Sequence, residues 1–186
     1  YEIMPSLVGS EMCIRDSAST LPEFTGFNRY LYASGGARVE GAELTATLIK
    51  ASGFEKLEGQ VTLSPLDDGT YEIDGQTFDK VILACGAWLG QTLEPLGFEV
   101  DVRPQKGQLR DYFFEGMDTG KLPVLMPEGE LDVIPFAGGK ISVGASHEND
   151  QGFDLTVDEA VLEVLEEEAK TYFPDLSTDK SFSERV

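Results

Sequence analysis

The amino-acid sequence predicts a mixed α/β (α+β) fold in which part of a parallel-sheet domain precedes an antiparallel-sheet domain. Residues 81–84 are four apolar residues in a row, which is typical of a strand buried on both faces of a parallel sheet. Residues 108–145 hold several alternating apolar and polar segments between short turns, which favours antiparallel pairing. Residues 156–173 have apolar residues at helical spacing and precede Pro174, which cannot continue a helix.

Composition excludes several classes of function. The 186 residues carry a formal net charge of −20, which disfavours binding to nucleic acid or to an anionic membrane surface. No apolar run approaches the roughly 18 residues that a membrane-spanning helix needs. The two cysteines provide no disulfide framework, so we expect a reducing, cytoplasmic location.

Residues 1–17 differ from the rest of the chain. They lack the basic start and sustained apolar centre of a secretory signal, and they resemble the translation of a sequencing adapter joined to a gene. We therefore expect an artefactual leader over 1–17, one domain over 18–102 and a second domain over 103–186.

The first domain is predicted to hold one helix and a three-stranded meander. Residues 18–38 are expected to be irregular, and residues 40–52 to form a helix that ends at Gly53. Asp-Gly pairs punctuate the next segments and predict hairpin turns. The expected strands are 61–64, 70–73 and 77–84, the last one continuing into the buried parallel strand.

The second domain is predicted to be mainly antiparallel. After a short helical turn broken by Pro95 and Gly97, strands are expected over 100–102, 108–114, 122–126, 131–135 and 140–145. The helix over 156–173 should begin with a capping box formed by Thr156 and Glu159.

One face of this helix is expected to pack on the sheet, and the opposite face to meet solvent. The expected apolar face consists of Val157, Val161, Val164 and Leu165, later joined by Ala169 and Phe173. The run 166–168 of three glutamates is interpreted as a solvated face.

Three ordered motifs carry a family resemblance. The strand 81–84 ends in Cys85-Gly86-Ala87-Trp88, and Arg103-Pro-Gln-Lys-Gly-Gln108 follows further along. A third element joins Val133-Ile-Pro135 to Ile141-Ser-Val-Gly-Ala-Ser146. Together they resemble the D-amino-acid oxidase family of FAD-dependent oxidoreductases, which includes glycine oxidase. The resemblance implies an FAD-binding Rossmann-like domain followed by a substrate domain built on an antiparallel sheet.

The resemblance also implies where the cofactor FAD would be contacted. The expected cofactor-binding residues are Leu57, Ala84, Gly86, Ala87, Trp88, Gly107 and Gln108. Small residues at the strand end would let the cofactor approach the backbone closely. Two alternatives stay open: Trp88 as a packing residue under the turn, and Gly107 with Gln108 as an interdomain contact without a ligand. Cys85 is expected to be a small buried residue.

Two further positions are candidates for catalysis. Asp132 stands where family members often have an aromatic residue, and His147 where they often have methionine. Near a flavin, Asp132 could bind a substrate ammonium, and His147 could transfer a proton or contact a carboxylate. The alternative is that both face solvent at a domain edge. The scattered acids and lone histidine lack the spacing of a metal site.

The implied activity is oxidation of the C–N bond of a small amino acid or amine, of the D-amino acid, glycine or sarcosine type, by hydride transfer to flavin. Oxygen or a quinone would be the electron acceptor, with peripheral membrane contact expected only for a dehydrogenase. Two alternatives are the flavin domain of a tRNA wobble-uridine modification enzyme and a non-catalytic interaction domain.

The resemblance further implies that the chain is an internal fragment. The glycine-rich pyrophosphate turn and a substrate-carboxylate arginine in a Gly-(Leu/Ile)-Arg step are expected outside this sequence, Arg185 preceding that step. We therefore expect the isolated chain to be inactive and, with its parallel strand uncovered, prone to aggregate.

Overall fold

The computed structural model describes residues 12–16, 23–27, 29–33, 37–176 and 181–186. The chain divides into two compact units. Unit 1 comprises the described residues up to Glu40 together with 106–148 and 154–186, and unit 2 comprises 41–105 and 149–153. None of the helices in these described ranges has the length and hydrophobicity that crossing a membrane requires.

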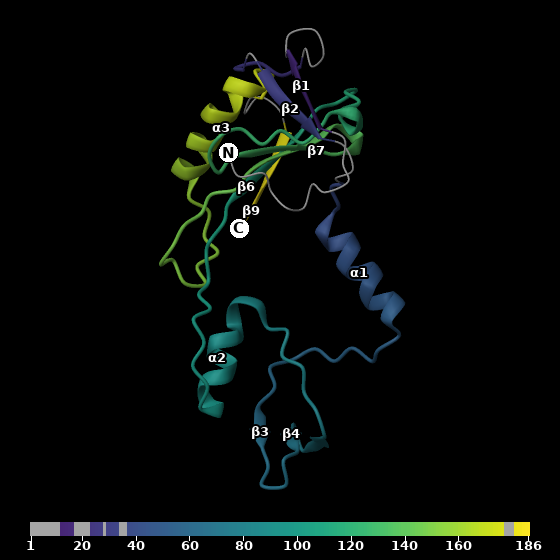
Figure 1. Ribbon diagram of the computed structural model, residues 1–186, viewed down its shortest axis with the longest axis vertical. Coiled ribbons are helices and arrows are strands. Elements are labelled where there is room, and N and C mark those ends of the chain that lie inside the picture. The colour runs from purple at the N-terminus through teal and green to yellow at the C-terminus, as the bar shows by residue number, and fades with distance from the viewer. Residues whose placement is uncertain (1–11, 17–22, 28, 34–36, 177–180) are drawn as a thin grey trace. The chain divides into compact units, whose positions relative to one another are not determined.

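Unit 1 is built on a four-stranded antiparallel sheet, labelled in Figure 1. Its strands are β6 (Leu109–Phe113), β7 (Asp132–Pro135), β8 (Lys140–Gly144) and β9 (Ser181–Arg185), in the order β7-β8-β6-β9. Neighbouring strands pair antiparallel, which confirms the pairing predicted from the alternating sequence. β9 was not predicted, because the segment 181–185 is short and mostly polar. Residues 122–126 form no strand, although Leu125 makes a single bridge to Val133.

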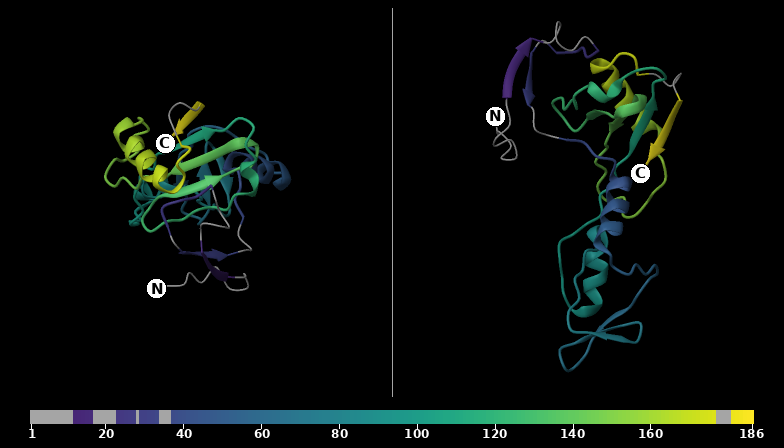
Figure 2. Two further views of the ribbon diagram at one scale, coloured as in Figure 1. Left: turned by 90° about the horizontal axis from the view of Figure 1, so that it is seen from above. Right: turned by 90° about the vertical axis from the view of Figure 1, so that its right-hand side faces the viewer.

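The helix α3 (Glu159–Tyr172) lies alongside this sheet and contacts β8 (Figures 1 and 2). The buried core lies between the helix and one face of the sheet, where aromatic and branched side chains exclude water. It consists of Phe24, Tyr112, Phe114, Leu122, Leu131, Val133, Ile141, Val143, Ala169, Phe173 and Leu176.

The start of α3 differs from the prediction. Asp158 is the N-cap, and its carboxylate accepts a hydrogen bond from Ala160 N at 3.0 Å. Thr156 instead donates to Asp154, and Glu159 accepts from Arg110. The predicted Thr156–Glu159 capping box is therefore wrong, because both side chains have stronger partners outside the helix terminus.

The buried side of α3 is also rotated from the expected one. Leu162, Glu166 and Ala169 are buried, whereas Val164 is 66% exposed. Interpreting Glu166 as part of a solvated face was wrong. A buried guanidinium, that of Arg110, lies beneath this carboxylate and compensates its charge.

A tight turn between β7 and β8 depends on glycine. Residues Ala137–Gly139 form a 3₁₀ turn, and Gly139 has φ +86°. A Cβ atom at Gly139 would lie 2.1 Å from the carbonyl oxygen of Phe114, so no larger residue fits without moving the backbone. A second 3₁₀ turn, Thr119–Lys121, packs beside it.

The two N-terminal strands of unit 1 pair with each other. β1 (Met12–Asp16) and β2 (Arg29–Ala33) form an antiparallel two-stranded sheet. The expectation that 18–38 is irregular is therefore wrong for 29–33, whose polar and aromatic residues gain a backbone partner in β1. The artefactual origin of residues 1–17 stays a prediction.

Unit 2 contains the predicted helix and meander. Helix α1 is Gly41–Ser52, and β3 (Leu63–Pro65), β4 (Tyr71–Ile73) and β5 (Gln76–Phe78) pair in sequence order. Helix α2 (Leu89–Leu93) follows the 3₁₀ turn Gly86–Trp88 and runs into the 3₁₀ turn Glu94–Leu96, which ends at a left-handed Gly97 as expected.

The predicted parallel strand over 81–84 does not form in this structure. The segment has no strand assignment, and Ile82 is 92% exposed. The strands described in unit 2 are all antiparallel, so none supplies the parallel neighbours that would cover both faces of such a strand. Residues 100–102 likewise form no strand, and Cys85 is half-buried rather than buried.

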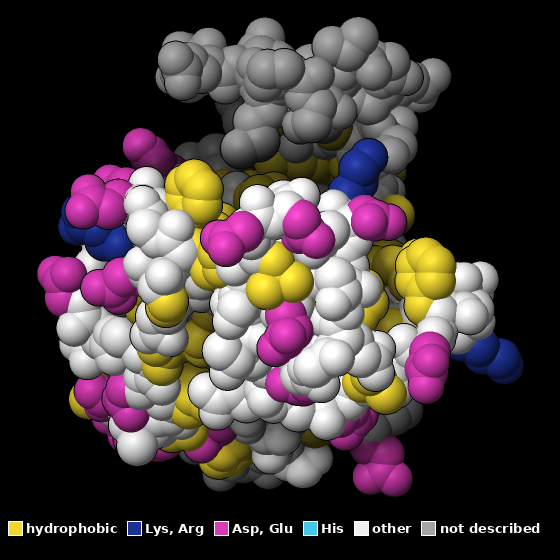
Figure 3. Space-filling view, turned by 90° about the horizontal axis from the view of Figure 1, so that it is seen from below, with side chains coloured by type: hydrophobic (Ala, Val, Ile, Leu, Met, Phe, Trp, Pro, Cys, Tyr) yellow, Lys and Arg dark blue, Asp and Glu magenta, His cyan; other side chains and the backbone are white. Residues whose placement is uncertain are grey.

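Hydrophobic side chains of unit 2 lie largely in contact with solvent. No described residue of this unit is buried, and the apolar side of α1, including Leu44, Leu48 and Ile49, is exposed. On the molecular face drawn in Figure 3, exposed hydrophobic side chains lie among acidic ones. Unit 2 therefore lacks an apolar core of its own among the described residues.

Candidate functional site

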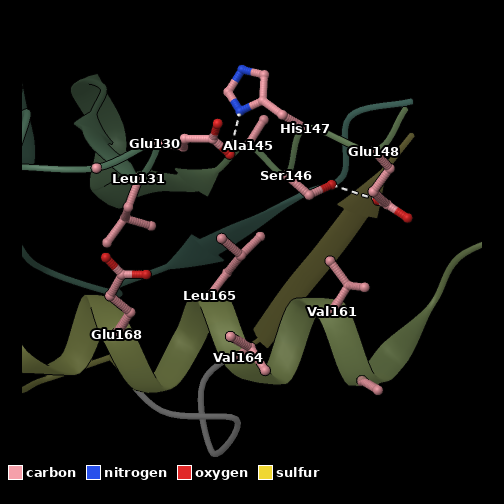
Figure 4. Close-up of a pocket in the computed structure, with 12 residues that line it drawn as sticks. Glu130, Leu131, Ala145, Ser146, His147, Glu148, Val161, Val164, Leu165 and Glu168 are labelled. Atoms are coloured by element: carbon pink, nitrogen blue, oxygen red, sulfur yellow. Dashed lines mark hydrogen bonds and ion pairs between the residues drawn. The ribbon is translucent and has the colours of Figure 1, made fainter. Parts of the chain in front are cut away.

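The two predicted catalytic residues lie at one end of the unit 1 sheet. Asp132 begins β7 and pairs with Gly144, the last residue of β8, and His147 follows three residues later. The imidazole Nδ1 of His147 lies 3.1 Å from the Glu130 carboxylate (Figure 4). Partial burial raises the pKa of Asp132 above its usual value, and the nearby charge of His147 opposes that rise. The structure thus brings Asp132 and His147 within electrostatic reach of each other.

An open groove with a volume of about 540 Å³ lies between this end of the sheet and α3. Figure 4 shows α3 presenting Val161, Val164 and Leu165 to it, while His147 lies on the sheet side with its ring directed away from the helix. The lining residues are Gly129, Glu130, Leu131, Ala145, Ser146, His147, Glu148, Ala160, Val161, Val164, Leu165 and Glu168. Asp132 is close by but does not line the groove.

Gln108 is fully buried, and both its side chain and its backbone make hydrogen bonds inside the chain. Its Nε2 donates to Glu148 at 2.7 Å, and its Oε1 accepts from Asp158 N at 2.7 Å. Its backbone N donates to Ser146 Oγ at 2.9 Å. The side chain therefore ties the start of α3 to the segment after β8, and all of these partners lie in unit 1. The contact is thus structural but lies within one unit, unlike the interdomain contact of the alternative, and a contact of Gln108 with FAD stays a prediction.

Gly107 allows the same segment to run close to a neighbouring backbone. A Cβ there would lie 3.2 Å from the Ser146 carbonyl oxygen. Hydrogen bonds from Ser146 and Gln108 hold the pKa of the Glu148 carboxyl below its usual value. Glu148 is thus an anionic acceptor that organises this corner of unit 1.

A buried lysine completes the corner, and the sequence analysis assigned it no role of its own. The Lys106 ammonium donates to Asp154 at 2.9 Å and to the Thr156 carbonyl at 2.5 Å. Hydrogen bonds from Thr156 and then from Lys106 lower the pKa of Asp154 to about 2. Burial of Lys106 with these acceptors fixes the loop that leads into α3.

The predicted cofactor-binding residues of unit 2 lie on an accessible turn. Gly86 has φ +53°, and no atom lies within 4 Å of the position that a Cβ would occupy. Ala84 is exposed and Ala87 is half-buried, so backbone on this turn is open to a ligand. This open space fits the close approach of a cofactor to the backbone.

The aromatic and apolar candidates beside that turn are also accessible. Trp88 is 57% exposed and stacks on Phe153 with ring centroids 4.9 Å apart and planes 13° apart. This contact supports a packing role for Trp88. Leu57 is 80% exposed and belongs to no helix or strand. FAD binding by Trp88 and Leu57 stays a prediction.

A buried ion network lies on the α3 face of the sheet. The Arg110 guanidinium donates to Glu166 at 3.0 Å, to Glu184 at 2.7 Å and to Glu159 at 2.5 Å. The hydroxyl of Tyr112 donates to the same Glu166 oxygen at 2.5 Å. Desolvation works to raise the pKa of Glu166, but these donors and Lys170 outweigh it and keep the pKa below its usual value.

A second network on the opposite face of the sheet was missed by the sequence analysis. The buried carboxylate of Asp111 accepts from Arg185 at 2.8 Å and from the hydroxyl of Ser142. The available signal was the pair Arg110-Asp111, because adjacent residues of a strand point to opposite faces and each charge then needs its own partner.

The antiparallel sheet of unit 1, with charged groups at its open end, agrees with the substrate domain that the sequence motifs imply. Comparison with known proteins identifies the class of protein. The profile of the family described as FAD dependent oxidoreductase matches residues 7–185. The chain therefore belongs to the D-amino-acid oxidase family of FAD-dependent oxidoreductases, and the resemblance drawn from the sequence is confirmed. FAD is the cofactor of this family.

Individual relatives are oxidoreductases. The chain is 36% identical over 132 residues to the uncharacterized oxidoreductase YurR of Bacillus subtilis, covering 67% of this chain and 35% of that protein. It is 32% identical over 178 residues to glycine oxidase of Pseudomonas aeruginosa, covering 90% of this chain and 48% of the relative.

Solved structures agree with the predicted fold class. Iminodiacetate oxidase from Chelativorans sp. BNC1 has a TM-score of 0.83 and 29% identity, covering 93% of this chain and 50% of its own. Glycine oxidase from Geobacillus kaustophilus has a TM-score of 0.78 at 19% identity, covering 96% of this chain and 52% of its own. The chain thus spans about half or less of the length of these relatives.

Proposed function

We propose that the protein containing this chain oxidises the C–N bond of a small amino acid or amine with FAD as its cofactor. Family membership supports an oxidoreductase, and relatives named glycine oxidase and iminodiacetate oxidase support a small amino-acid substrate. The observation that carries the proposal is the placement of Asp132 and His147 together at the open end of the β7–β8 pair.

The residues of this site suit the recognition of an amine. An ionised Asp132 attracts a substrate ammonium, and its partial burial strengthens that attraction relative to water. Glu130 engages Nδ1 of His147, so Nε2 is left without a partner among the described residues and can exchange a proton with the substrate nitrogen. FAD, when bound, supplies the two-electron acceptor for the oxidation.

Measurement of the flavin and of turnover tests this function. The purified protein that contains this chain should show the visible absorption bands of a flavin. Glycine, sarcosine, iminodiacetate or a D-amino acid should bleach these bands under anaerobic conditions. Reoxidation by oxygen or by an added quinone then identifies the electron acceptor. A protein that binds FAD but is reduced by no amine would contradict the proposed activity.

Variants of Asp132 and His147 test whether these two residues act in the proposed oxidation. His147→Gln should lower kcat/KM by about 10²–10⁴-fold, the usual effect of losing a general acid or base. Asp132→Asn should raise KM for the amine by about tenfold or more, the usual effect of losing a charge-assisted contact. Glu163→Gln, which removes an exposed charge of α3 that does not line the groove, serves as the control and should leave turnover unchanged. Unchanged kcat/KM in both Asp132 and His147 variants would remove them from the site.

A further inference from the structure

The helix side of the groove between α3 and the end of the sheet is apolar and faces solvent. We call this groove of about 540 Å³ the α3 groove (Figure 4). Its helix wall consists of Val161, Val164 and Leu165, which stand at the i, i+3 and i+4 spacing of a single helix face. Val164 is 66% exposed, so most of a valine side chain on this wall lies in water.

The α3 groove is preformed, because residues of the core make up its floor. Leu131 lines the groove and belongs to the buried core, and Leu165 packs against that core from the helix. Close packing holds such side chains in place. An apolar ligand can therefore bury Val164 without first opening a cavity, and apolar surface removed from water contributes about 25 cal/mol per Å².

Carboxylates surround this apolar surface. Glu130, Glu148 and Glu168 line the α3 groove, and the lining residues that the structure describes include no lysine or arginine. His147 is the one basic side chain in that lining, and it is paired with Glu130. An apolar surface with an acidic border is complementary to an occupant that carries both apolar and cationic groups.

The form of the groove favours a helical occupant over an extended one. The part of α3 that lines it runs from Ala160 to Glu168, which is about 12 Å along the helix axis and slightly more than two turns. An extended peptide needs free backbone groups to pair with, but Ser146 N and Glu148 N beside the groove already donate to the carbonyls of residues 108 and 106. A helix satisfies its own backbone and needs only side-chain contacts.

Charge argues against two other occupants. A second copy of this chain would bring the same glutamates against one another, and each copy carries a net charge of −20. The surface of an anionic membrane would be repelled for the same reason. A partner rich in lysine or arginine is instead attracted to this face.

We propose that the α3 groove binds an amphipathic helix of a partner protein. Its apolar side chains pack on the valines and leucine of α3, and its lysines or arginines meet the three lining glutamates. The ring of His147 is directed away from α3, so the partner leaves the imidazole free (Figure 4). Asp132 does not line the groove, and the inference does not depend on the proposed amine oxidation.

Methyl NMR of the purified protein that contains this chain tests the inference. The probe is a synthetic helical peptide of alanine, leucine and lysine with leucines at positions i, i+3, i+4 and i+7. It should shift the methyl signals of Leu131, Val161, Val164 and Leu165 until they saturate. A peptide of the same composition with its leucines spread around the helix has the same charge and should bind about tenfold more weakly or worse.

Two variants separate the apolar contact from the charge. Val164→Ser should weaken binding of the amphipathic peptide about tenfold, because the serine offers little apolar surface to bury. Glu168→Gln should weaken it about twofold to fivefold and reduce its sensitivity to salt. Val39→Ser and Glu163→Gln are the matched controls and should leave binding unchanged, since both residues are exposed and neither lines the groove.

Several outcomes would overturn the proposal. Equal binding of the two peptides would show that charge alone attracts them, and absence of methyl shifts would show that the groove is not accessible in the whole protein. Shifts of the same methyl signals with protein concentration, without peptide, would assign the groove to a second copy. Shifts caused by vesicles of anionic phospholipid would assign it to a membrane surface.

Discussion

Arg110 donates a hydrogen bond to Glu166 at 3.0 Å inside the core of unit 1, and both side chains are almost completely buried. Removing one member of a buried ion pair leaves the other charge without compensation. We expect Arg110→Met to lower the free energy of unfolding by about 3–5 kcal/mol in chemical denaturation.

Glu167→Gln is the control for that experiment, because Glu167 is adjacent to Glu166 but exposed. It should change stability by less than about 0.5 kcal/mol. Combining Arg110→Met with Glu166→Leu should recover part of the lost free energy of unfolding. A double variant that is less stable than Arg110→Met alone would refute the ion-pair explanation.

Gln108 offers a test of whether a residue predicted to bind FAD is structural. Gln108→Ala removes one of the two side-chain donors to Glu148 and the acceptor of the Asp158 backbone N–H, so we expect the free energy of unfolding to fall by about 1–3 kcal/mol. The melting temperature measured without flavin reports this loss directly. Gln105→Ala, which removes an exposed bond to Asn149, should have little effect. A Gln108 variant that is destabilised only in the presence of FAD would indicate a cofactor contact instead.

The turn between β7 and β8 provides a matched pair of glycines. Gly138 and Gly139 both have positive φ, but only Gly139 lies against the carbonyl oxygen of Phe114. Gly138→Ala should cost about 1–2 kcal/mol from its left-handed backbone alone. Gly139→Ala should cost at least about 1–3 kcal/mol more, because the added methyl group must displace backbone. Equal unfolding midpoints for the two variants would show that the turn can relax.

The pair Lys106–Asp154 predicts a dependence of stability on acid. The pKa of Asp154 is lowered to about 2 by hydrogen bonds from Thr156 and Lys106, so the folded state binds this proton less readily than the unfolded chain. Its contribution is complete above the ordinary value of 3.8 and is lost as the pH falls toward about 2. NMR titration of the Asp154 carboxyl carbon should give the lowered midpoint, and Asp154→Asn should remove this part of the acid sensitivity. A midpoint near 3.8 would contradict the prediction.

Unit 2 should open more easily than unit 1. No described residue of unit 2 is buried, whereas β6 and β8 of unit 1 lie in the centre of a sheet. Amide hydrogens of α1 and the β3–β5 meander should therefore exchange faster than those of β6 and β8 by mass spectrometry. The exposed segment 81–84 should also promote aggregation of the isolated chain, and Ile82→Lys should reduce light scattering at equal concentration. Slow exchange throughout unit 2 would contradict this account.

Sequence periodicity predicted the elements whose side chains alternate or recur regularly. α1, β3, β4, β6, β7 and β8 lie within about two residues of their predicted bounds, whereas β5 ends at Phe78 and the strand predicted there extends to residue 84. The parallel strand at 81–84 failed because strand formation depends on neighbours that a local apolar run does not reveal. β9 was missed because its polar residues are stabilised by charges on β6, which lies far away in the sequence.

The candidate site could be predicted only in part. Asp132 and His147 stood out because they depart from a family pattern, and the structure places them near each other. Arg185 and Asp111 form a pair that no local pattern signals, because 74 residues separate them in the chain. The buried face of α3 differs from the predicted one for the same reason. Arg110, which is distant in sequence, compensates the charge of Glu166 and makes its burial favourable.

The adjacent charges of β6 also determine how β9 can align with it. Arg110 holds Glu184 on one face of the sheet, and Asp111 holds Arg185 on the other. A shift of β9 by one residue in one direction would set Arg185 against Arg110 and Glu184 against Asp111, while a shift in the other direction would leave Arg110 opposite Ser183. Two successive ion pairs of opposite polarity therefore select a single alignment of β9 with β6. Because β9 is an edge strand with a mostly polar sequence, burial of apolar side chains in the core could do little to select that alignment.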